Sequence, residues 1–511
     1  MWHPRAARVG TRGERVAAGR PPTYGRAVTA ASPPAAPADP RPGTLGALRA
    51  SGHVHRTVKE ELRDNLLARM RSGASAGERF PGIVGFDETV LPHLERALLA
   101  GHDVVLLGER GQGKTRLIRT LVGLLDEETP VVAGCEINDH PYAPACSRCR
   151  RLREELGDEL PVAWRARDER YGEKLATPDT SVGDLIGDVD PVKVAEGRTL
   201  GDPETVHYGL VPRTNRGIFA VNELPDLAER IQVALLNVLE ERDIQVRGYQ
   251  LRLPLDVVLL ASANPEDYTN RGRIITPLKD RFGAEVRTHY PLRLDDEVAL
   301  VAQEADLGAV VPAYLLEVVA RFTRSVRESP AVDQRSGISA RFAVAAAETV
   351  AASALRRAAL VGEPVAVARV CDLAPVVETL LGKVEFEVSE EGREVEVLAH
   401  LLRRAVSETF RRRLSATDLS ALVERFDGGL VVESGDLVPA ARLLEQVGPL
   451  PGLAHVLERL EVDEGLHEGD TAPGLAAGAL ELAMEGLFLN RRISKDSVGT
   501  SDGTRTVYGG G

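Results

Sequence analysis

The sequence lacks a hydrophobic run long enough to cross a membrane, and it lacks an excess of positive charge. No apolar stretch approaches the roughly 18 residues that a membrane span requires, and no charged segment followed by an apolar one marks a signal peptide. The 76 acidic residues outnumber the 63 basic residues, so the formal net charge is −13. This balance argues against a general binder of nucleic acid or acidic membranes, which needs a basic face. We expect a cytoplasmic protein.

Aromatic residues are also scarce, at 4% of the 511 residues, although the composition is otherwise that of an ordinary globular protein. This length allows about two to four domains. Residues 1–50 differ from the rest because they are rich in Ala, Pro, Gly and Arg. Such a segment cannot bury enough apolar surface to order itself, so it is predicted to be a disordered tail. The polar, Gly-rich residues 493–511 are predicted to be a second flexible tail.

One segment has the pattern of a phosphate-binding loop. Val104–Leu107 is a run of four apolar residues, typical of a buried strand, and the G-x-x-x-x-G-K-T sequence of Gly108–Thr115 follows it. In a P-loop, glycines let backbone N–H groups point at phosphates, the lysine reaches the β- and γ-phosphates, and the Thr hydroxyl binds Mg²⁺. The alternative is a structural glycine turn. The residues expected to contact the nucleotide are Gly108, Glu109, Arg110, Gly111, Gln112, Gly113, Lys114, Thr115 and Arg116.

Two further predicted strands end in polar side chains. Residues 217–223 form an apolar run ending at Asn222 and Glu223, and residues 255–264 form another ending at Asn264. Residues 131–134 are predicted to be a further strand, and residues 150–216 an irregular region. Strands that alternate with helices predict a parallel α/β sheet, in which ligands bind at the carboxyl ends of the strands. From about residue 294 onward the sequence is predicted to be helical.

Together these segments resemble the AAA+ ATPases, in the branch of MoxR and the ATPase (I) subunit of magnesium chelatase. The resemblance covers roughly residues 80–350, and it is most specific in Phe80–Gly85, Gly209–Ile218 and Leu278–Gly283. It implies a P-loop parallel sheet flanked by helices, followed by an α-helical lid and a helical C-terminal region. The implied domains are an α/β domain over 51–293 with a hairpin insert near 175–216, a lid over 294–380, and a helical region over 381–492.

The resemblance also assigns roles to single residues. Glu223 would orient and deprotonate the attacking water, Asn264 would hold the same water, and Arg281 would act as an arginine finger in a neighbouring subunit's site. The alternatives are a surface carboxylate, a strand-end turn former and a surface ion pair, respectively. Arg271 and Arg273 compete with Arg281 for the finger. The family's lid helix carries a sensor-2 arginine, which corresponds best to Arg341, with Arg335 in reserve.

The cofactors implied by the resemblance are ATP and Mg²⁺, and the implied partners are further copies in a hexameric ring and a separate von Willebrand A-type protein. The chain itself has no D-x-S-x-S metal-adhesion motif. One alternative function is a nucleotide-dependent scaffold or switch with little hydrolysis. Another is a σ54-type transcriptional activator, against which count the missing GAFTGA-like loop and the missing basic helix-turn-helix at the C-terminus.

One residue departs from the family pattern. The run of residues 217–223 resembles the Walker B strand of the family. That strand normally ends in Asp-Glu, whereas this chain has Asn222-Glu223. An amide keeps the oxygen that helps hold the water shell of Mg²⁺ but loses the negative charge. We therefore expect weaker Mg²⁺ binding and slower turnover than in typical relatives.

Three cysteines form a separate pattern. Cys135, Cys146 and Cys149 have the spacing C-x10-C-x2-C, with His140 between the first two. In a reducing cytoplasm this favours Zn²⁺ over a disulfide. A structural zinc site needs four ligands, so His140 is predicted to be the fourth. The alternative is a set of reduced, partly buried thiols. Cys371 stands alone in an apolar segment and is predicted to lie in a core.

Overall fold

The computed structural model describes most of the chain after the N-terminal segment. The described residues are 41–190, 192, 195–196, 205–241, 244–246, 249–251, 253–264, 273–333, 337–462, 469–500 and 503–510. Most of the predicted N-terminal tail, together with Arg271 and Arg335, therefore lies outside the described residues.

A five-stranded parallel sheet forms the centre of the α/β part. Its strand order is β11-β1-β10-β7-β4, and every neighbouring pair is parallel. The three apolar runs predicted as strands are buried along their whole length, because they occupy the middle of the sheet and are covered on both faces. This confirms the predicted fold class. The strands are β1 (Val104–Leu107), β4 (Tyr171–Leu175), β7 (Gly217–Asn222), β10 (Val257–Ala263) and β11 (Ala284–Arg287).

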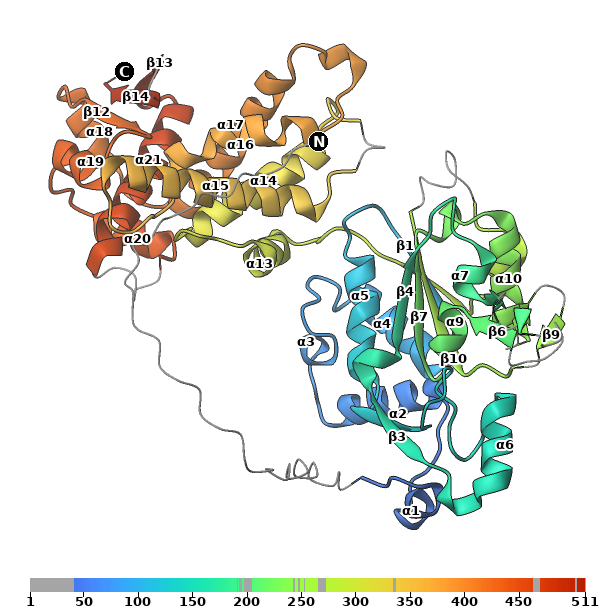
Figure 1. Cartoon of the computed structure of the whole chain (residues 1–511). Helices are drawn as coiled ribbons and strands as arrows, with labels where there is room; N and C mark the ends of the chain where they lie inside the picture. Colours follow the sequence, from blue (N-terminus) through green and yellow to red (C-terminus); the bar gives the residue numbers. More distant parts are fainter. Residues whose placement is uncertain are drawn as a thin grey trace, which may run out of the picture. The chain divides into compact units, whose positions relative to one another are not determined.

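Side chains that alternate along each strand enter two separate cores. In β1, Val104 and Leu106 pack in one core with apolar residues of α2, α4 and α5, whereas Val105 and Leu107 pack in the other with α10 and α12. Figure 1 shows α4 and α5 on one side of the strands and α7 and α10 on the other. The helices are α2 (Val58–Arg71), α3 (Ala76–Arg79), α4 (Val90–Leu99), α5 (Lys114–Thr120), α7 (Val182–Leu185), α9 (Leu210–Arg213), α10 (Glu229–Glu240) and α12 (Thr276–Arg281).

The strand predicted at residues 131–134 is present over Val131 and Val132, but it does not join the main sheet. Strand β2 (Glu128–Val132) instead pairs antiparallel with β3 (Val162–Ala166) in a separate two-stranded ribbon, from which α6 (Ser147–Leu156) projects. The edge strand of the main sheet is β4, inside the region predicted to be irregular. Its sequence, Tyr-Gly-Glu-Lys-Leu, has no apolar run because an edge strand is only half-buried.

Two hairpins extend from the α/β part. Strands β5 (Gly187–Val189) and β6 (Val206–Tyr208) pair antiparallel within the insert expected near 175–216. Strands β8 (Ile244–Val246) and β9 (Tyr249–Leu251) pair antiparallel after α10.

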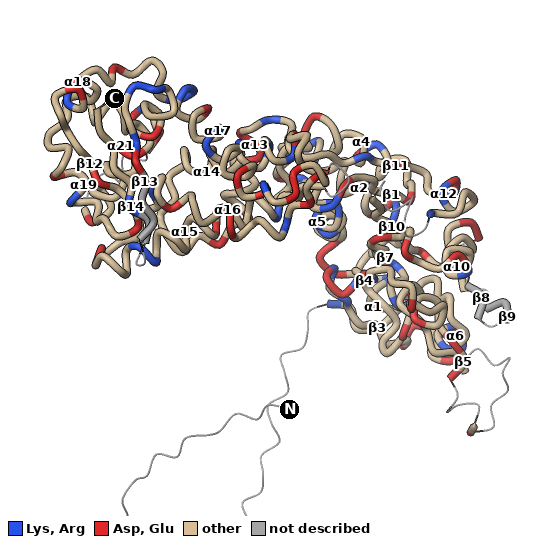
Figure 2. Tube along the Cα trace, turned by 90° about the horizontal axis from the view of Figure 1, so that it is seen from above, with Lys and Arg blue, Asp and Glu red and all other residues tan. Residues whose placement is uncertain are grey.

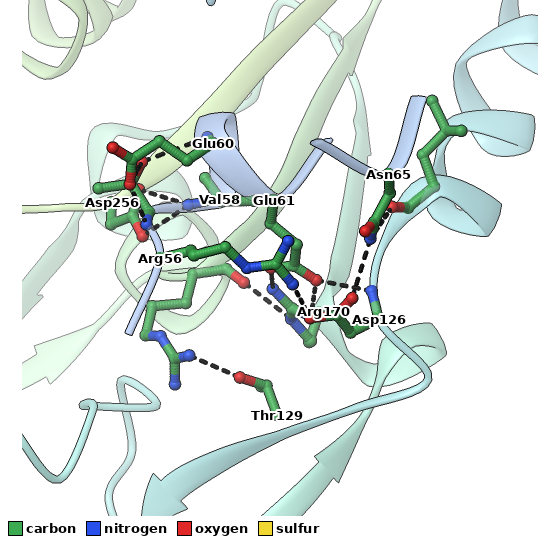
Figure 3. Close-up of polar contacts among 12 residues, drawn as sticks. Arg56, Val58, Glu60, Glu61, Asn65, Asp126, Thr129, Arg170 and Asp256 are labelled. Atoms are coloured by element: carbon green, nitrogen blue, oxygen red, sulfur yellow. Dashed lines mark hydrogen bonds and ion pairs between the residues drawn. The ribbon is translucent and has the colours of Figure 1, made fainter. Parts of the chain in front are cut away.

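Helix α2 is fixed to the sheet by a buried polar network (Figure 3). The guanidinium of Arg170 donates to both carboxylate oxygens of Glu61 at 2.8 and 2.6 Å, and both side chains are almost completely buried. The backbone N–H of Val58 donates to Asp256, and the amide of Asn65 donates to Asp126. The first half of α2 is thereby anchored next to the segments that lead into β4 and β10.

The helical part after residue 294 has a single hydrophobic core. Residues from Val301 to Tyr508 belong to one buried cluster, so the boundary predicted near residue 380 does not separate two cores. Residues 382–393, between α16 and α17, contain short 3-10 turns. The helices are α13 (Leu294–Glu304), α14 (Ala313–Arg327), α15 (Ala340–Val361), α16 (Pro375–Leu380), α17 (Glu394–Leu414), α18 (Ser420–Asp427), α19 (Ala440–Val447), α20 (Leu453–Arg459) and α21 (Ala472–Leu489).

Both predicted tails contain regular structure. Within residues 1–50, helix α1 (Leu45–Ala50) buries Leu45 and Leu48. At the other end, β13 (Ser494–Thr500) and β14 (Gly503–Gly509) form a hairpin, and β14 also pairs with β12 (Val432–Gly435). The prediction of a flexible tail over 493–511 is wrong because it weighed the glycine content above the strand-forming Thr, Val and Tyr residues near 504–508.

Contrary to the expectation from the sequence, one described helical segment, Gly469–Leu489, is long and apolar enough to cross a membrane by length and composition alone. However, 67% of its apolar window is buried within the protein. Its carboxylates Glu481 and Glu485 are also buried, and they accept hydrogen bonds at 2.6 Å from Ser434 and Tyr508. The segment therefore packs as a core helix of the helical part.

Acidic and basic residues are interspersed over the described helices and strands (Figure 2). This distribution matches a chain with 76 acidic and 63 basic residues.

Candidate nucleotide-binding site

The glycine-rich loop lies between β1 and α5, where close contacts require glycine. Gly111 and Gly113 have φ values of +74° and +75°, in the left-handed region that glycine tolerates best. A Cβ atom on Gly111 would lie 2.2 Å from the Cβ of Ser339, the residue that precedes α15. A Cβ on Gly108 would lie 2.0 Å from the Oγ1 of Thr288. The loop is therefore packed tightly between the sheet and the start of α15.

Lys114 is buried and held inside this loop. Its Nζ donates to the carbonyl oxygens of Gly108 and Glu109 and, at 2.7 Å, to the Oδ1 of Asn264. Asn264 follows β10, the strand next to β1. The structure thus brings the P-loop lysine and the predicted water-holding amide into direct contact. A phosphate at this position would meet an ammonium group that is already oriented.

The hydroxyl of Thr115 begins a chain of polar contacts across the strand ends. Its Oγ1 donates to the Oδ1 of Asn222 at 3.2 Å, and the Oγ of Ser262 donates to the same oxygen at 3.1 Å. The Nδ2 of Asn222 donates to the Oε1 of Glu173 at 2.6 Å. Asn222 therefore links the threonine expected to bind Mg²⁺ with a carboxylate on the adjacent strand.

The sequence analysis did not identify Glu173. It lies on β4, the edge strand that the sequence did not reveal, and no motif marks it. Its carboxylate accepts hydrogen bonds from Arg119 at 2.8 and 2.9 Å and from the hydroxyl of Tyr171 at 2.8 Å. Burial opposes ionisation, but these hydrogen bonds outweigh it and lower the pKa of Glu173. The site thus contains a charged carboxylate next to Asn222.

Glu223 follows β7 in an unusual backbone conformation. Its φ of 55° and ψ of 47° place it in the left-handed region, which is uncommon for residues other than glycine. Its backbone N–H donates to the Oγ of Ser262 at 3.3 Å. Such conformations cost energy and occur often at functional sites. Gly108, Asn264 and Glu223 directly follow the parallel strands β1, β10 and β7. Since these strands are neighbours, the three residues lie together at the carboxyl ends of the strands.

The predicted finger residue, Arg281, ends α12 and is partly exposed. It pairs with Glu240 at 2.8 Å and with Asp280 at 2.9 Å, and the hydrogen bond with Glu240 raises its pKa. Within one chain it is thus a surface ion pair, which is the alternative that the sequence left open. The competing candidate Arg273 uses its carbonyl oxygen to accept a hydrogen bond from Gln232.

Several residues near the start of the helical part contact the P-loop. The hydroxyl of Tyr290 donates to the carbonyl of Arg110 at 2.9 Å, and the guanidinium of Arg327 lies 4.0 Å from the centre of the Tyr290 ring. Arg116 forms an ion pair with Glu304 of α13. Arg341 is exposed in the first turn of α15, two residues after the serine that abuts the loop. Thr288 donates to the side chain of Gln112 at 2.8 Å.

The cysteine cluster forms a second site, remote in sequence from the P-loop. The donor atoms of Cys135, Asp139, Cys146 and Cys149 all lie within 4.8 Å of one another. His140 is elsewhere: its Nε2 lies 3.3 Å from the Nε2 of His53. The prediction of His140 as the fourth ligand is therefore wrong, because the turn directs the preceding residue, Asp139, toward the thiols.

Burial determines the ionisation of the side chains around this turn. It lowers the pKa of His140 to about 2, with the charge of Arg216 adding to the effect. Burial, together with the neighbouring Cys146, raises the pKa of Asp139 to about 7. His140 is therefore neutral, and it stacks on the ring of His53 at a centroid separation of 5.5 Å.

Comparison with known proteins identifies one matching family profile and several relatives. A family profile described as the sigma-54 interaction domain matches residues 198–281, which include β7, β10 and Arg281. The magnesium-chelatase subunit ChlI of a Nostoc species is 30% identical over 247 residues, covering 46% of this chain and 61% of that protein. The magnesium-chelatase 38 kDa subunit of Acidiphilium rubrum is 32% identical over 234 residues, covering 43% and 61%. The chain thus spans only about six tenths of these relatives.

Among solved structures, the complex between subunits BchI and BchD of magnesium chelatase matches at 22% identity, covering 62% of this chain and 98% of that chain. The TM-score of this match is 0.33. The sequence relatives, the parallel sheet and the glycine-rich loop all indicate the same P-loop fold. The chain is thus similar in sequence to magnesium-chelatase ATPase subunits, which are AAA+ proteins, and its parallel sheet and glycine-rich loop fit the fold that the sequence predicts.

Proposed function

We propose that this chain is a Mg²⁺-dependent ATPase that works as a ring of identical subunits in the cytoplasm. It couples ATP hydrolysis to the remodelling of a separate partner protein, or to the activation of metal insertion by that partner. A von Willebrand A-type protein is the expected partner class. The observation that carries this proposal is the convergence of Lys114, Asn222, Glu223 and Asn264 at the carboxyl ends of adjacent strands.

The donor set around Thr115 suits Mg²⁺. The hydroxyl of Thr115, the amide oxygen of Asn222 and the carboxylate of Glu173 are hard oxygen donors linked by hydrogen bonds, and Mg²⁺ prefers oxygen ligands and retained water. When bound with ATP, the ion would neutralise charge on the β- and γ-phosphates. Thr115 would hold it directly, and Asn222 and Glu173 would hold its water shell.

The remaining residues act on the reacting groups. Lys114 binds the phosphates, and Glu223 accepts the proton of the attacking water. Asn264 exchanges its contact with Lys114 for one with that water. Arg281 leaves its exposed ion pairs and enters the site of a neighbouring subunit, where it neutralises charge on the transferred phosphoryl group. Arg341 contacts the nucleotide from the first turn of α15.

Replacing Asn222 by aspartate is expected to strengthen the Mg²⁺ dependence of turnover and to lower the stability of the nucleotide-free protein. In Asn222→Asp, a carboxylate replaces the amide that now donates to Glu173 at 2.6 Å. Losing this hydrogen bond and placing two like charges together should lower the stability of the nucleotide-free protein by about 1–3 kcal/mol. Mg²⁺ with ATP should recover the loss, and turnover should rise. Thermal melting with and without Mg²⁺-ATP measures the loss of stability and its recovery, and a hydrolysis assay measures turnover.

The double variant Asn222→Asp/Glu173→Gln is the matched control, since it removes the repulsion and keeps the new aspartate. Its nucleotide-free stability should return toward that of the wild type. Unchanged melting and an unchanged Mg²⁺ requirement in the single variant would show that Asn222 does not contribute to the ion's surroundings.

The test of the proposed function combines ATP turnover with the mass of the protein in solution. With ATP, the wild type should assemble into a ring and hydrolyse the nucleotide, whereas Lys114→Ala should not hydrolyse it. A scaffold with little hydrolysis, the alternative favoured by Asn222, would assemble with ATP without turnover. A protein that stays a monomer with every nucleotide would contradict the ring.

A σ54-type transcriptional activator is a second candidate because the sigma-54 interaction profile matches residues 198–281. The sequence has no GAFTGA-like loop, which counts against it. An activator would bind purified σ54 in the presence of an ATP transition-state analogue, and the proposed motor would not. This binding assay separates the two functions.

A further inference from the structure

We propose that Cys135, Cys146, Cys149 and Asp139 bind one structural Zn²⁺ ion. Cys135 lies in the turn after β2, and Cys146 and Cys149 lie at the start of α6, so the ion would join this turn to the next helix along the chain. The four donor atoms lie within 4.8 Å of one another, a spacing that one tetrahedral ion can bridge. The ligand set differs from the one that the cysteine spacing predicts, because Asp139 takes the place of His140.

The carboxylate of Asp139 supplies an independent observation. This residue is only 1% exposed, and its Oδ2 accepts the backbone N–H of Cys146 at 2.9 Å. Its other oxygen, Oδ1, is buried and has no hydrogen-bond partner among the described residues. A buried carboxylate oxygen without a partner is costly, and native proteins seldom leave one so. A cation among the three sulfur atoms would satisfy it.

The backbone around the thiols is already arranged for a metal. The Sγ of Cys135 accepts the N–H of Asp139 at 3.4 Å, and the Sγ of Cys146 accepts the N–H of Cys149 at 3.3 Å. Hydrogen bonds of this kind stabilise thiolates and fix their direction, as the outer partners of metal ligands do. Three thiolates with one carboxylate favour Zn²⁺ over Mg²⁺ or Ca²⁺, which prefer oxygen donors. The three thiols release their protons when the ion binds.

The site would fix the base of the insert that precedes the Walker B strand. The amide of Asn215 donates to the carbonyl of Ile137 at 3.0 Å, and the amide of Asn138 donates to the carbonyl of Arg213 at 2.7 Å. These bonds join the cysteine turn to the segment that leads from the hairpin into β7. The zinc ion would therefore hold the hairpin in place relative to the strand that carries Asn222 and Glu223.

The experiment measures metal in the full-length protein purified without chelators. Elemental analysis should find about one zinc per chain. In Cys149→Ser and Asp139→Asn, the zinc content should fall at least about tenfold. The controls His140→Gln and Cys371→Ser should keep it. Replacing zinc with Co²⁺ should give the visible absorption of a tetrahedral thiolate site.

A chelator provides a measurement that needs no variant. Asp139 lines an open hollow together with His55, Arg150 and Arg216, so an ion that leaves the buried cluster can be captured by a chelator. Chelation should lower the melting temperature of the wild type and expose three more thiols to a thiol reagent, and added Zn²⁺ should reverse both effects. Wild-type protein without zinc, whose melting is insensitive to chelators, would overturn the proposal. So would a cysteine disulfide within the cluster, or zinc that Asp139→Asn keeps and His140→Gln loses.

Discussion

Replacing Glu223 by glutamine is expected to lower ATP turnover by about 10²–10⁴-fold while leaving ATP binding nearly unchanged. Glutamine has the shape of glutamate but cannot take a proton from the attacking water. Glu223 lies beside the site rather than in the P-loop, and its backbone N–H is held by Ser262, so the substitution should not disturb the phosphate contacts. Single-turnover hydrolysis and the binding of a fluorescent ATP analogue measure the two quantities separately.

The matched control is Asp226→Asn, which neutralises a carboxylate only three residues further along the chain, in the short 3-10 helix that Glu223 caps. Its turnover should stay close to that of the wild type. Equal turnover in Glu223→Gln and the wild type would exclude Glu223 as the base. Retained remodelling of the partner by an inactive Glu223→Gln protein would favour the scaffold over the motor.

Replacing Arg281 by alanine is expected to reduce turnover by about 10³–10⁵-fold, the effect of losing an arginine finger. The side chain is partly exposed and pairs with Glu240 and Asp280, so its removal should cost little stability. A large loss of activity with an unchanged melting temperature would therefore reflect the missing Arg281 contact in a neighbouring subunit's site and not a loss of folding. Lys279→Ala, in the same helix, is the control and should keep its activity.

Mixing two inactive variants tests whether Arg281 acts on a neighbour. Lys114→Ala keeps the finger but cannot bind the phosphates, whereas Arg281→Ala keeps the phosphate site but lacks the finger. In a mixed ring, some sites combine an intact Lys114 with an intact Arg281 from the next subunit, so activity should reappear. No recovery in rings shown to be mixed would contradict an action between subunits. Full activity of Arg281→Ala alone would transfer the role to Arg271 or Arg273.

The sequence revealed the strands that the fold buries most deeply. Strands β1, β7 and β10 are covered by helices on both faces, and this requires the continuous apolar runs that a reader of the sequence can see. Strand β4 lies at the edge of the sheet and carries Glu173 and Lys174 among half-buried positions. Because its identity depends on pairing with β7, neither the strand nor the contact between Glu173 and Asn222 was predictable.

The same limit applies to the cysteine cluster. Spacing along the chain correctly grouped three cysteines, but it could not distinguish Asp139 from its neighbour His140. The choice depends on how the turn after β2 directs each side chain, and on the histidines His53 and His55, which occupy the other side. These two histidines come from a segment more than 80 residues earlier, so the arrangement is tertiary.

The measurement that tests the central claim most directly is ATP hydrolysis by the purified wild type, with and without Mg²⁺, beside Lys114→Ala. The account predicts turnover that requires Mg²⁺ and that disappears in the variant, because Lys114 holds the phosphates next to Asn264. Turnover that persists in Lys114→Ala would contradict it, because the activity would then come from elsewhere than the loop between β1 and α5.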